Sequence, residues 1–185
     1  MLDALGLVDM LLPELASLKG LEQPKKYHIY DAYEHTVKAF ECAPPRLRFA
    51  ALLHDIGKAE SIKSTGNMHS HAQIGAELAD GICKRFKLPN SERKRLVNIV
   101  ALHMTDVKGD MRKGKLRRFV VENLDVIRDL YDFMDADSIA HKGESGRSAA
   151  IRRVVKEIED AGTPLRVKDL KISGQGVVNM GVDEK

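Results

Sequence analysis

The amino-acid sequence predicts an all-α fold. Apolar residues recur at intervals of three and four along most of the 185 residues, which is the period of helices with one buried face. Prolines and glycines fall between these stretches, and no segment has the alternation that would require a β-sheet. Hydrophobic residues make up 43% of the chain and charged residues 31%, as in a water-soluble globular domain.

The first half of the chain is predicted to form three helices, over residues 2–12, 31–43 and 46–56. Pro13 interrupts the first, because proline is poorly tolerated inside a helix. Asp31 is the expected N-cap of the second, with Glu34 three residues later as in a capping box. Gly57 is the expected C-terminal stop of the third, and the polar residues 58–70 are predicted to form a loop.

The second half is predicted to be helical over 71–87, 91–104, 115–122, 125–141 and 147–160. Loops that contain charges or glycines separate these segments at 105–114 and 142–146. The helical pattern fades after Thr163-Pro164, so residues 163–185 are predicted to form a short irregular C-terminal tail. The sequence has no repeat of solenoid length and no low-complexity segment, and its length suits one domain with short appendages.

Nothing in the sequence predicts membrane insertion or export. No apolar run approaches the roughly 20 residues that a transmembrane helix needs, and the N-terminus lacks the cationic start of a signal peptide. The two cysteines, Cys42 and Cys83, form neither a disulfide framework nor a zinc motif. We therefore expect a cytoplasmic protein without a membrane partner.

The net charge is only +3, but basic residues gather in two places. The first basic cluster comprises Lys84, Arg85, Lys87, Arg93, Lys94 and Arg95. The second basic cluster comprises Lys108, Arg112, Lys113, Lys115, Arg117 and Arg118. Such clusters can attract the phosphate backbone of RNA, and the alternative interpretation is a solvated helix face.

Four histidines occupy positions where the helical pattern expects an inward-facing side chain, namely His35, His54, His103 and His141. Any one of them is more often a core histidine with a polar partner than a ligand. A buried polar group without a hydrogen bond costs roughly 1–3 kcal/mol. A shared metal ion would satisfy several of these rings at once.

The adjacent pair His54-Asp55 closes the apolar run 49–53. A carboxylate that directly follows such a run needs a cation or a metal ion if it is buried. Because an imidazole and a carboxylate next to each other can reach one ion, the pair indicates a metal site. Mixed nitrogen and oxygen ligation suits Mn, Fe, Co, Ni, Zn or Mg and does not choose among them.

A second carboxylate is predicted on the helix 125–141. Its apolar stripe comprises Ile127, Leu130 and Met134, and the next position on that stripe is Asp137. Asp135 is the competing candidate, and we favour Asp137.

The run Leu52-Leu53-His54-Asp55-Ile56-Gly57-Lys58 resembles the signature of the HD superfamily of metal-dependent phosphohydrolases. The pattern of that family is an early His, a later His-Asp pair and a distant Asp, which this sequence matches in order with His35, His54, Asp55 and Asp137. The runs 30–36, 71–77 and 88–90 are similar to the HD region of bacterial tRNA nucleotidyltransferases and poly(A) polymerases. The resemblance covers nearly the whole chain. It implies an HD-domain helical bundle over 26–162, with an N-terminal helix and linker, 1–25, packed on it.

The resemblance also implies roles for single residues. The implied ligands of a divalent metal ion are His35, His54, Asp55 and Asp137. Asp55 would also orient the attacking water, and Lys58 would reach a phosphate unless it is simply a charge at a helix C-terminus. His71 and His103 take places comparable to the extra histidines of two-metal members. They are expected either to bind a second ion or contact the scissile phosphate, or else to support the ligands or pack in the core.

The implied reaction is metal-dependent hydrolysis of a phosphate ester on a nucleotide or an RNA end, such as a 2′,3′-cyclic phosphate. The sequence contains no Gly-Gly or Gly-Ser turn followed by an Asp-x-Asp pair, so nucleotide addition is not implied. The chain is expected to be either a standalone HD protein or the C-terminal portion of a longer one. The alternatives are a non-catalytic RNA-binding body fragment of a tRNA nucleotidyltransferase-like protein and a nucleotide pyrophosphohydrolase.

Overall fold

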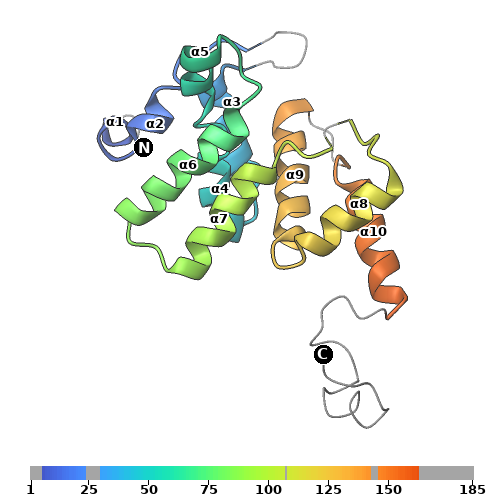
Figure 1. Ribbon diagram of the computed structural model, residues 1–185. Coiled ribbons are helices and arrows are strands. Elements are labelled where there is room, and N and C mark those ends of the chain that lie inside the picture. The colour runs from blue at the N-terminus through green and yellow to red at the C-terminus, as the bar shows by residue number, and fades with distance from the viewer. Residues whose placement is uncertain (1–5, 24–29, 107, 143–145, 163–185) are drawn as a thin grey trace, which may run out of the picture.

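A computed structural model describes residues 6–23, 30–106, 108–142 and 146–162. All regular elements within these ranges are helices, which confirms the all-α prediction (Figure 1). The predicted tail, 163–185, lies outside the described residues. Among the helices of the described ranges, none has the length and apolar character needed to cross a bilayer.

The helices follow one another along the chain as α1 (Leu7–Leu11), α2 (Pro13–Ala16), α3 (Ala32–Cys42), the 3-10 helix η1 (Pro45–Leu47), α4 (Arg48–Leu53), α5 (Lys58–Thr65), α6 (His71–Arg85), α7 (Asn90–Leu102), α8 (Lys113–Glu122), α9 (Ile127–Lys142) and α10 (Ala149–Asp160). Those from α6 onward correspond to the predicted helices with ends shifted by a few residues.

Two apolar cores meet at α9, which stands between α3–α7 on one side and α8 with α10 on the other (Figure 1). Phe133, Ala136 and Ala140 face the first core, which also contains Leu15 and Leu18 of the N-terminal segment. The other face of α9 belongs to the second core through Ile127, Leu130 and Met134. Because both faces are apolar, α9 is fixed from two sides, and this fixes any polar side chain that it carries between them.

The start of α3 is the predicted capping box. The carboxylate of Asp31 accepts a hydrogen bond from the backbone N–H of Glu34 at 2.7 Å, and the backbone N–H of Asp31 donates to the Glu34 carboxylate at 3.4 Å. Two backbone donors that a helix start leaves free are thereby satisfied. The register of α3, and so the inward direction of His35, is set at this cap.

The predicted loop 58–70 is wrong over its first part, where α5 forms. The hydroxyls of Ser64 and Thr65 donate to the carbonyls of Glu60 and Ser61, four residues earlier, both at 2.8 Å. The polar composition that suggested a loop is therefore satisfied inside a helix. Gly66 then ends α5 with a left-handed φ of 74°.

Gly57 is the N-cap of α5 and not the expected C-terminal stop of the preceding helix, because α4 already ends at Leu53; its φ is −76°. A Cβ atom at this position would lie 2.2 Å from the carbonyl oxygen of His71 and 2.5 Å from the backbone nitrogen of Gly75. A side chain would therefore force the chain after α4 away from α6. Glycine is needed here for close approach, which holds the His54-Asp55 turn against the first residue of α6.

One predicted helix is broken and another is followed by an unexpected one. The described part of the segment 2–12 contains α1, and α2 starts anew with Pro13 at its first position, where proline needs no hydrogen bond. The segment 46–56 divides into η1 and α4, and residues 54–57 form turns. His54 thereby becomes the C-cap of α4 instead of an interior helical residue.

Candidate metal centre

Six polar side chains from five places in the fold converge where α3, α4, α6, α7 and α9 meet. All six residues are at least nine-tenths buried: His35, His54, Asp55, His71, His103 and Asp137. We call this group the His/Asp cluster. It brings together the predicted ligands His35, His54, Asp55 and Asp137 with His71 and His103. His141, the other histidine expected to face inward, is half-buried and its ring lies 5.8 Å from that of His35, outside the cluster. His69 is exposed on the surface, and His28 lies outside the described residues.

Asp55 lies at the middle of the cluster, with a pair of imidazoles at each oxygen. Its Oδ2 is 3.1 Å from Nε2 of His54 and 3.8 Å from Nε2 of His35. Its Oδ1 is 3.4 Å from Nε2 of His71 and 3.9 Å from Nε2 of His103. Two sets of donor atoms are close enough to hold an ion, His35 with His54 and Asp55, and Asp55 with His71 and His103.

Asp137, and not Asp135, faces the cluster. Its Oδ1 accepts a hydrogen bond from Nε2 of His35 at 3.0 Å and lies 3.5 Å from Nε2 of His54. Asp135 turns away and accepts hydrogen bonds from Ser148 and Arg152. Asp137, the α9 carboxylate favoured from the sequence, therefore points into the cluster, and its role as a metal ligand stays a prediction.

Three of the imidazoles are held in the same way. The Nδ1–H groups of His54, His71 and His103 donate to the backbone carbonyls three residues earlier in the chain, at 2.8, 2.6 and 2.6 Å. These bonds fix the rings and direct each Nε2 toward Asp55. A metal-binding histidine is commonly oriented by such a bond from its other nitrogen.

The Nε2 atoms show that a cation fits. Nε2 of His54 is buried and has no hydrogen-bond partner among the described residues, because its approach to Asp55 lacks hydrogen-bond geometry. Nε2 of His71 and Nε2 of His103 face each other at 3.1 Å. With Nδ1–H as the donor on both rings, two lone pairs oppose each other, which a cation between them would relieve. The donor set of nitrogens and carboxylate oxygens suits a first-row divalent ion.

Burial and charge act in opposite directions on the protonation of the carboxylates. Burial raises the pKa of Asp55, but the charges of His54 and Lys58 outweigh it and hold that pKa well below its ordinary value. Burial raises the pKa of Asp137 as well, but the hydrogen bond from His35 and the charge of His54 lower it overall. Both carboxylates are therefore ionised at neutral pH and available to a cation.

The histidines divide into two kinds. Burial lowers the pKa of His71, and it lowers the pKa of His103 to about 3, so both rings are neutral. Burial also lowers the pKa of His54, but the carboxylates of Asp55 and Asp137 raise it above its ordinary value. Since a metal ligand must be deprotonated, an ion bound at His54 would displace a proton.

Lys58 is buried beside Asp55, where its ammonium donates to Oδ2 of Asp55 and to Oε1 of Gln23, both at 2.5 Å. Gln23 belongs to the segment before α3 and is itself buried. Sequence reasoning missed Gln23, because nothing in its neighbourhood distinguishes it from a surface glutamine near Pro24.

Arg147 is the second residue that the sequence did not reveal. It precedes α10 and reaches back to the cluster, where its Nη1 donates to Oδ2 of Asp137 at 2.9 Å and its Nη2 to the carbonyl of His103 at 2.6 Å. A loop arginine ten residues after Asp137 has no periodic relation to it. Only the return of the chain after α9 brings the two together.

The two basic clusters differ in how far acidic partners neutralise them. In the first, Lys84 and Arg93 pair with Asp80, Arg85 with Glu14, and Arg95 with Asp129. In the second, Lys113 pairs with Glu157, and no ion pair is recorded for Arg112, Lys115, Arg117 or Arg118 within the described ranges. The second cluster thus keeps most of its positive charge.

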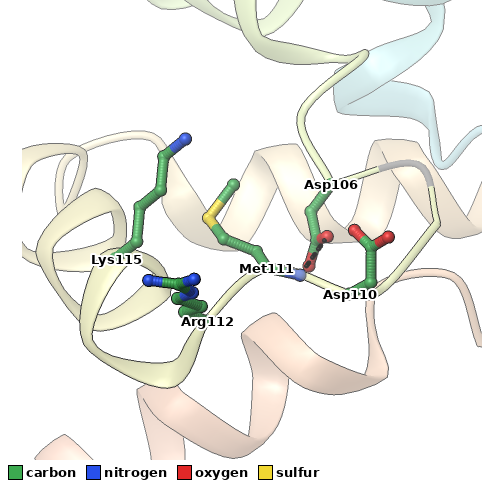
Figure 2. A pocket seen from close by; sticks show the side chains of 5 residues that line it. All are labelled: Asp106, Asp110, Met111, Arg112 and Lys115. Atoms are coloured by element: carbon green, nitrogen blue, oxygen red, sulfur yellow. Dashed lines mark hydrogen bonds between the residues drawn. The ribbon is translucent and has the colours of Figure 1, made fainter.

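A pocket of about 510 Å³ lies at the start of α8, apart from the His/Asp cluster (Figure 2). Arg112 and Lys115 stand on one side of it and Asp106 and Asp110 on the other, with Met111 between them. Asp106 accepts a hydrogen bond from the backbone N–H of Met111 at 2.9 Å. Because opposite charges line the two sides, this pocket does not select an anion or a cation.

Comparisons with known proteins agree with this geometry. A family model described as HD domain matches residues 19–159. The chain is 38% identical to the A-adding tRNA nucleotidyltransferase of Deinococcus radiodurans over 86% of its own length and 40% of that protein. It is 36% identical to the CC-adding tRNA nucleotidyltransferase of Thermus thermophilus over 77% of its own length and 35% of that protein. The chain thus spans about 40% or less of the length of these relatives.

Proposed function

Since the chain belongs to the HD domain family, we propose that it is a metal-dependent phosphohydrolase acting on nucleotides or RNA-end phosphates such as 2′,3′-cyclic phosphates. The observation that carries this proposal is the placement of Asp55 between two pairs of imidazole Nε2 atoms in a buried cluster. Relatives named as tRNA nucleotidyltransferases support a nucleotide or RNA substrate.

In this proposal each side chain has a defined task. His35, His54 and Asp55, with Asp137 beside them, hold one divalent ion, and Asp55 with His71 and His103 holds a second. A divalent ion supplies a Lewis acid that polarises a phosphate oxygen and lowers the pKa of water. Asp55, ionised and in contact with both sets of donors, also orients the attacking water.

Lys58 is assigned to Asp55 in this proposal. Both of its short bonds are made within the protein, to Asp55 and Gln23, so contact with a substrate phosphate would require the Gln23 bond to open. Its present contacts make it a positioning residue that fixes the direction of Oδ2. The ion pair with Asp55 is nearly inaccessible to water, which strengthens it relative to a surface pair.

We assign the catalytic unit to residues 26–162, with 1–25 packed on it. The burial of Leu15 and Leu18 in the first core and the bond from Lys58 to Gln23 support a close association of the two segments.

The decisive test is metal-dependent turnover. The purified chain, stripped with a chelator, is loaded separately with Mn, Co, Ni, Mg, Fe or Zn and assayed with 2′,3′-cyclic AMP, nucleoside monophosphates and bis-p-nitrophenyl phosphate. We expect turnover that Asp55→Ala and Asp55→Asn abolish, and that the exposed control Glu60→Gln on α5 retains. A folded, metal-loaded protein without turnover on any of these substrates would refute the hydrolase.

The second candidate is a non-catalytic RNA-binding body, which the unpaired charge of the second basic cluster favours. Replacing Arg112, Lys115 and Arg118 together by Gln should weaken RNA binding and reduce the salt slope by about 0.7–0.9 for each lost phosphate contact. Binding that survives His54→Ala in a protein without turnover would establish this candidate over the enzyme. RNA affinity unchanged by the triple substitution would exclude this surface.

A further inference from the structure

We propose that Arg147 is a positioning residue of the metal centre, which orients Asp137 and ties it to the end of α7. The inference rests on the proposed metal site and concerns a residue that touches neither an ion nor a substrate in this arrangement. Its basis is a pair of hydrogen bonds from one guanidinium to two different walls of the His/Asp cluster.

The first bond divides the Asp137 carboxylate into two separate roles. Oδ2 accepts from Nη1 of Arg147 at 2.9 Å, while Oδ1 points to His35 and His54 at 3.0 and 3.5 Å. With Oδ2 engaged, the carboxylate cannot rotate freely and offers one oxygen to the site. Charge-assisted hydrogen bonds of this kind are strong and directional.

The second bond fixes the element that carries His103. Nη2 of Arg147 donates at 2.6 Å to the carbonyl of His103, which caps the C-terminus of α7. Carbonyls at a helix end have no partner within the helix, so this one depends on an outside donor. The same side chain thereby sets the spacing between His103 and Asp137, which are 34 residues apart in the chain.

Only a guanidinium can make both contacts at once, since its donors lie in a rigid planar fork, whereas lysine presents a compact point charge. The backbone next to Arg147 is anchored as well. Ser148 bonds to the Asp135 carboxylate through its backbone N–H at 3.2 Å and its hydroxyl at 2.7 Å. The backbone that carries the Arg147 guanidinium is therefore fixed by Asp135 without a bound ion.

Burying the Arg147 guanidinium costs free energy of folding, because one of its donors has no partner in the described part of the chain. The Arg147 side chain is 13% exposed, and its Nε is buried with no hydrogen-bond partner among the described residues. An unsatisfied buried donor in a native protein calls for an explanation. Orientation of a metal ligand provides one, because outer partners of ligands typically contribute 10–100-fold to metal affinity.

The test compares Mn²⁺ and Ni²⁺ affinity by calorimetry for the wild type, Arg147→Met, Arg147→Lys, Arg147→Ala and the control Arg128→Met. Arg128 lies on α9, its side chain is 70% exposed, and it pairs with Glu159 away from the cluster. We expect about 10–100-fold weaker binding for Arg147→Met, an intermediate loss for Arg147→Lys, and wild-type affinity for Arg128→Met. Added methylguanidinium should partly restore the affinity of Arg147→Ala.

Arg147→Lys keeps the positive charge but cannot make both hydrogen bonds, so it tests the need for a guanidinium even if Arg147→Met fails to fold. Wild-type affinity in a folded Arg147→Met or Arg147→Lys protein would overturn the inference. An unchanged metal affinity with a raised KM would also overturn it, because Arg147 would then act on the substrate. Failure of the wild type to bind any ion would instead refute the metal site itself.

Discussion

Nε2 of His71 and Nε2 of His103 face each other at 3.1 Å, although the two residues belong to different helical segments and both are buried. The Nδ1–H of each ring donates a hydrogen bond to a backbone carbonyl. Two neutral imidazoles so arranged repel through their lone pairs, and the nearest compensating charge is Oδ1 of Asp55. In the proposed metal centre His71 and His103 therefore act as a pair of ligands, which belongs to the second set of donors.

Substitution of His103 should therefore remove one ion and leave the other. For His103→Gln we expect metal content to fall from two ions per chain to one, measured by elemental analysis after dialysis. His35, His54 and Asp137 are untouched by the change and should keep the first ion. His69→Gln, on the surface, is the matched control, and unchanged stoichiometry in His103→Gln would contradict a second site.

The metal-free protein should lose stability as the pH falls from about 6.5 toward 4. His103 has a pKa of about 3 when folded and near 6.5 when unfolded, so in this window the unfolded chain binds the extra proton and unfolding is favoured. His71 acts in the same direction. The raised pKa of His54 has the opposite sign, and its contribution is lost only above pH 6.5.

Urea titrations at several pH values measure this slope. His103→Gln should flatten it between pH 6.5 and 4. The steeper fall below about pH 4 should remain, because there the unfolded chain binds protons at Asp55 and Asp137, whose pKa values are lowered in the folded protein. Equal slopes for the variant and the wild type would show that His103 is protonated in the folded protein.

Gly57→Ala should damage both stability and the second set of donors. The added Cβ would meet the His71 carbonyl oxygen at 2.2 Å, so α6 or the turn must shift, at a cost of about 1–3 kcal/mol or more. We expect a lower free energy of unfolding and weaker metal binding. Gly81→Ala on α6 is the control: its Cβ meets nothing within 4 Å, and it should stabilise the helix by about 0.5–1 kcal/mol. Equal effects of the two substitutions would disprove the close-approach explanation.

Lys58→Met should destabilise the metal-free protein by about 3–5 kcal/mol, because it leaves the buried Asp55 carboxylate without its nearest cation. Added metal should restore part of that loss, since an ion supplies positive charge at the same carboxylate. Chemical denaturation with and without Mn²⁺ measures both effects. Lys63→Met is the control on the same helix, because the Lys63 side chain is 71% exposed and weakly paired. A Lys58→Met protein as stable as this control would rule out the proposed role of the ion pair.

Much of the fold could be predicted from the sequence, because the spacing of apolar residues within a helix shows which of its faces is buried. The apolar stripe of α9 identified Asp137, the capping box placed α3, and the His54-Asp55 pair indicated the cluster before its geometry was known. The same local rules failed at α5, where hydroxyls bonded within the helix instead of forming a loop.

Only the tertiary structure could supply Gln23 and Arg147. Neither lies on a periodic stripe or in a motif, and each reaches the cluster from a segment outside the helices that carry the ligands. Gly57 likewise owes its identity to the backbone of α6, not to its own turn. Periodicity determines which face of a helix turns inward, whereas the partners that meet that face depend on how distant segments pack, and packing leaves no local pattern in the chain.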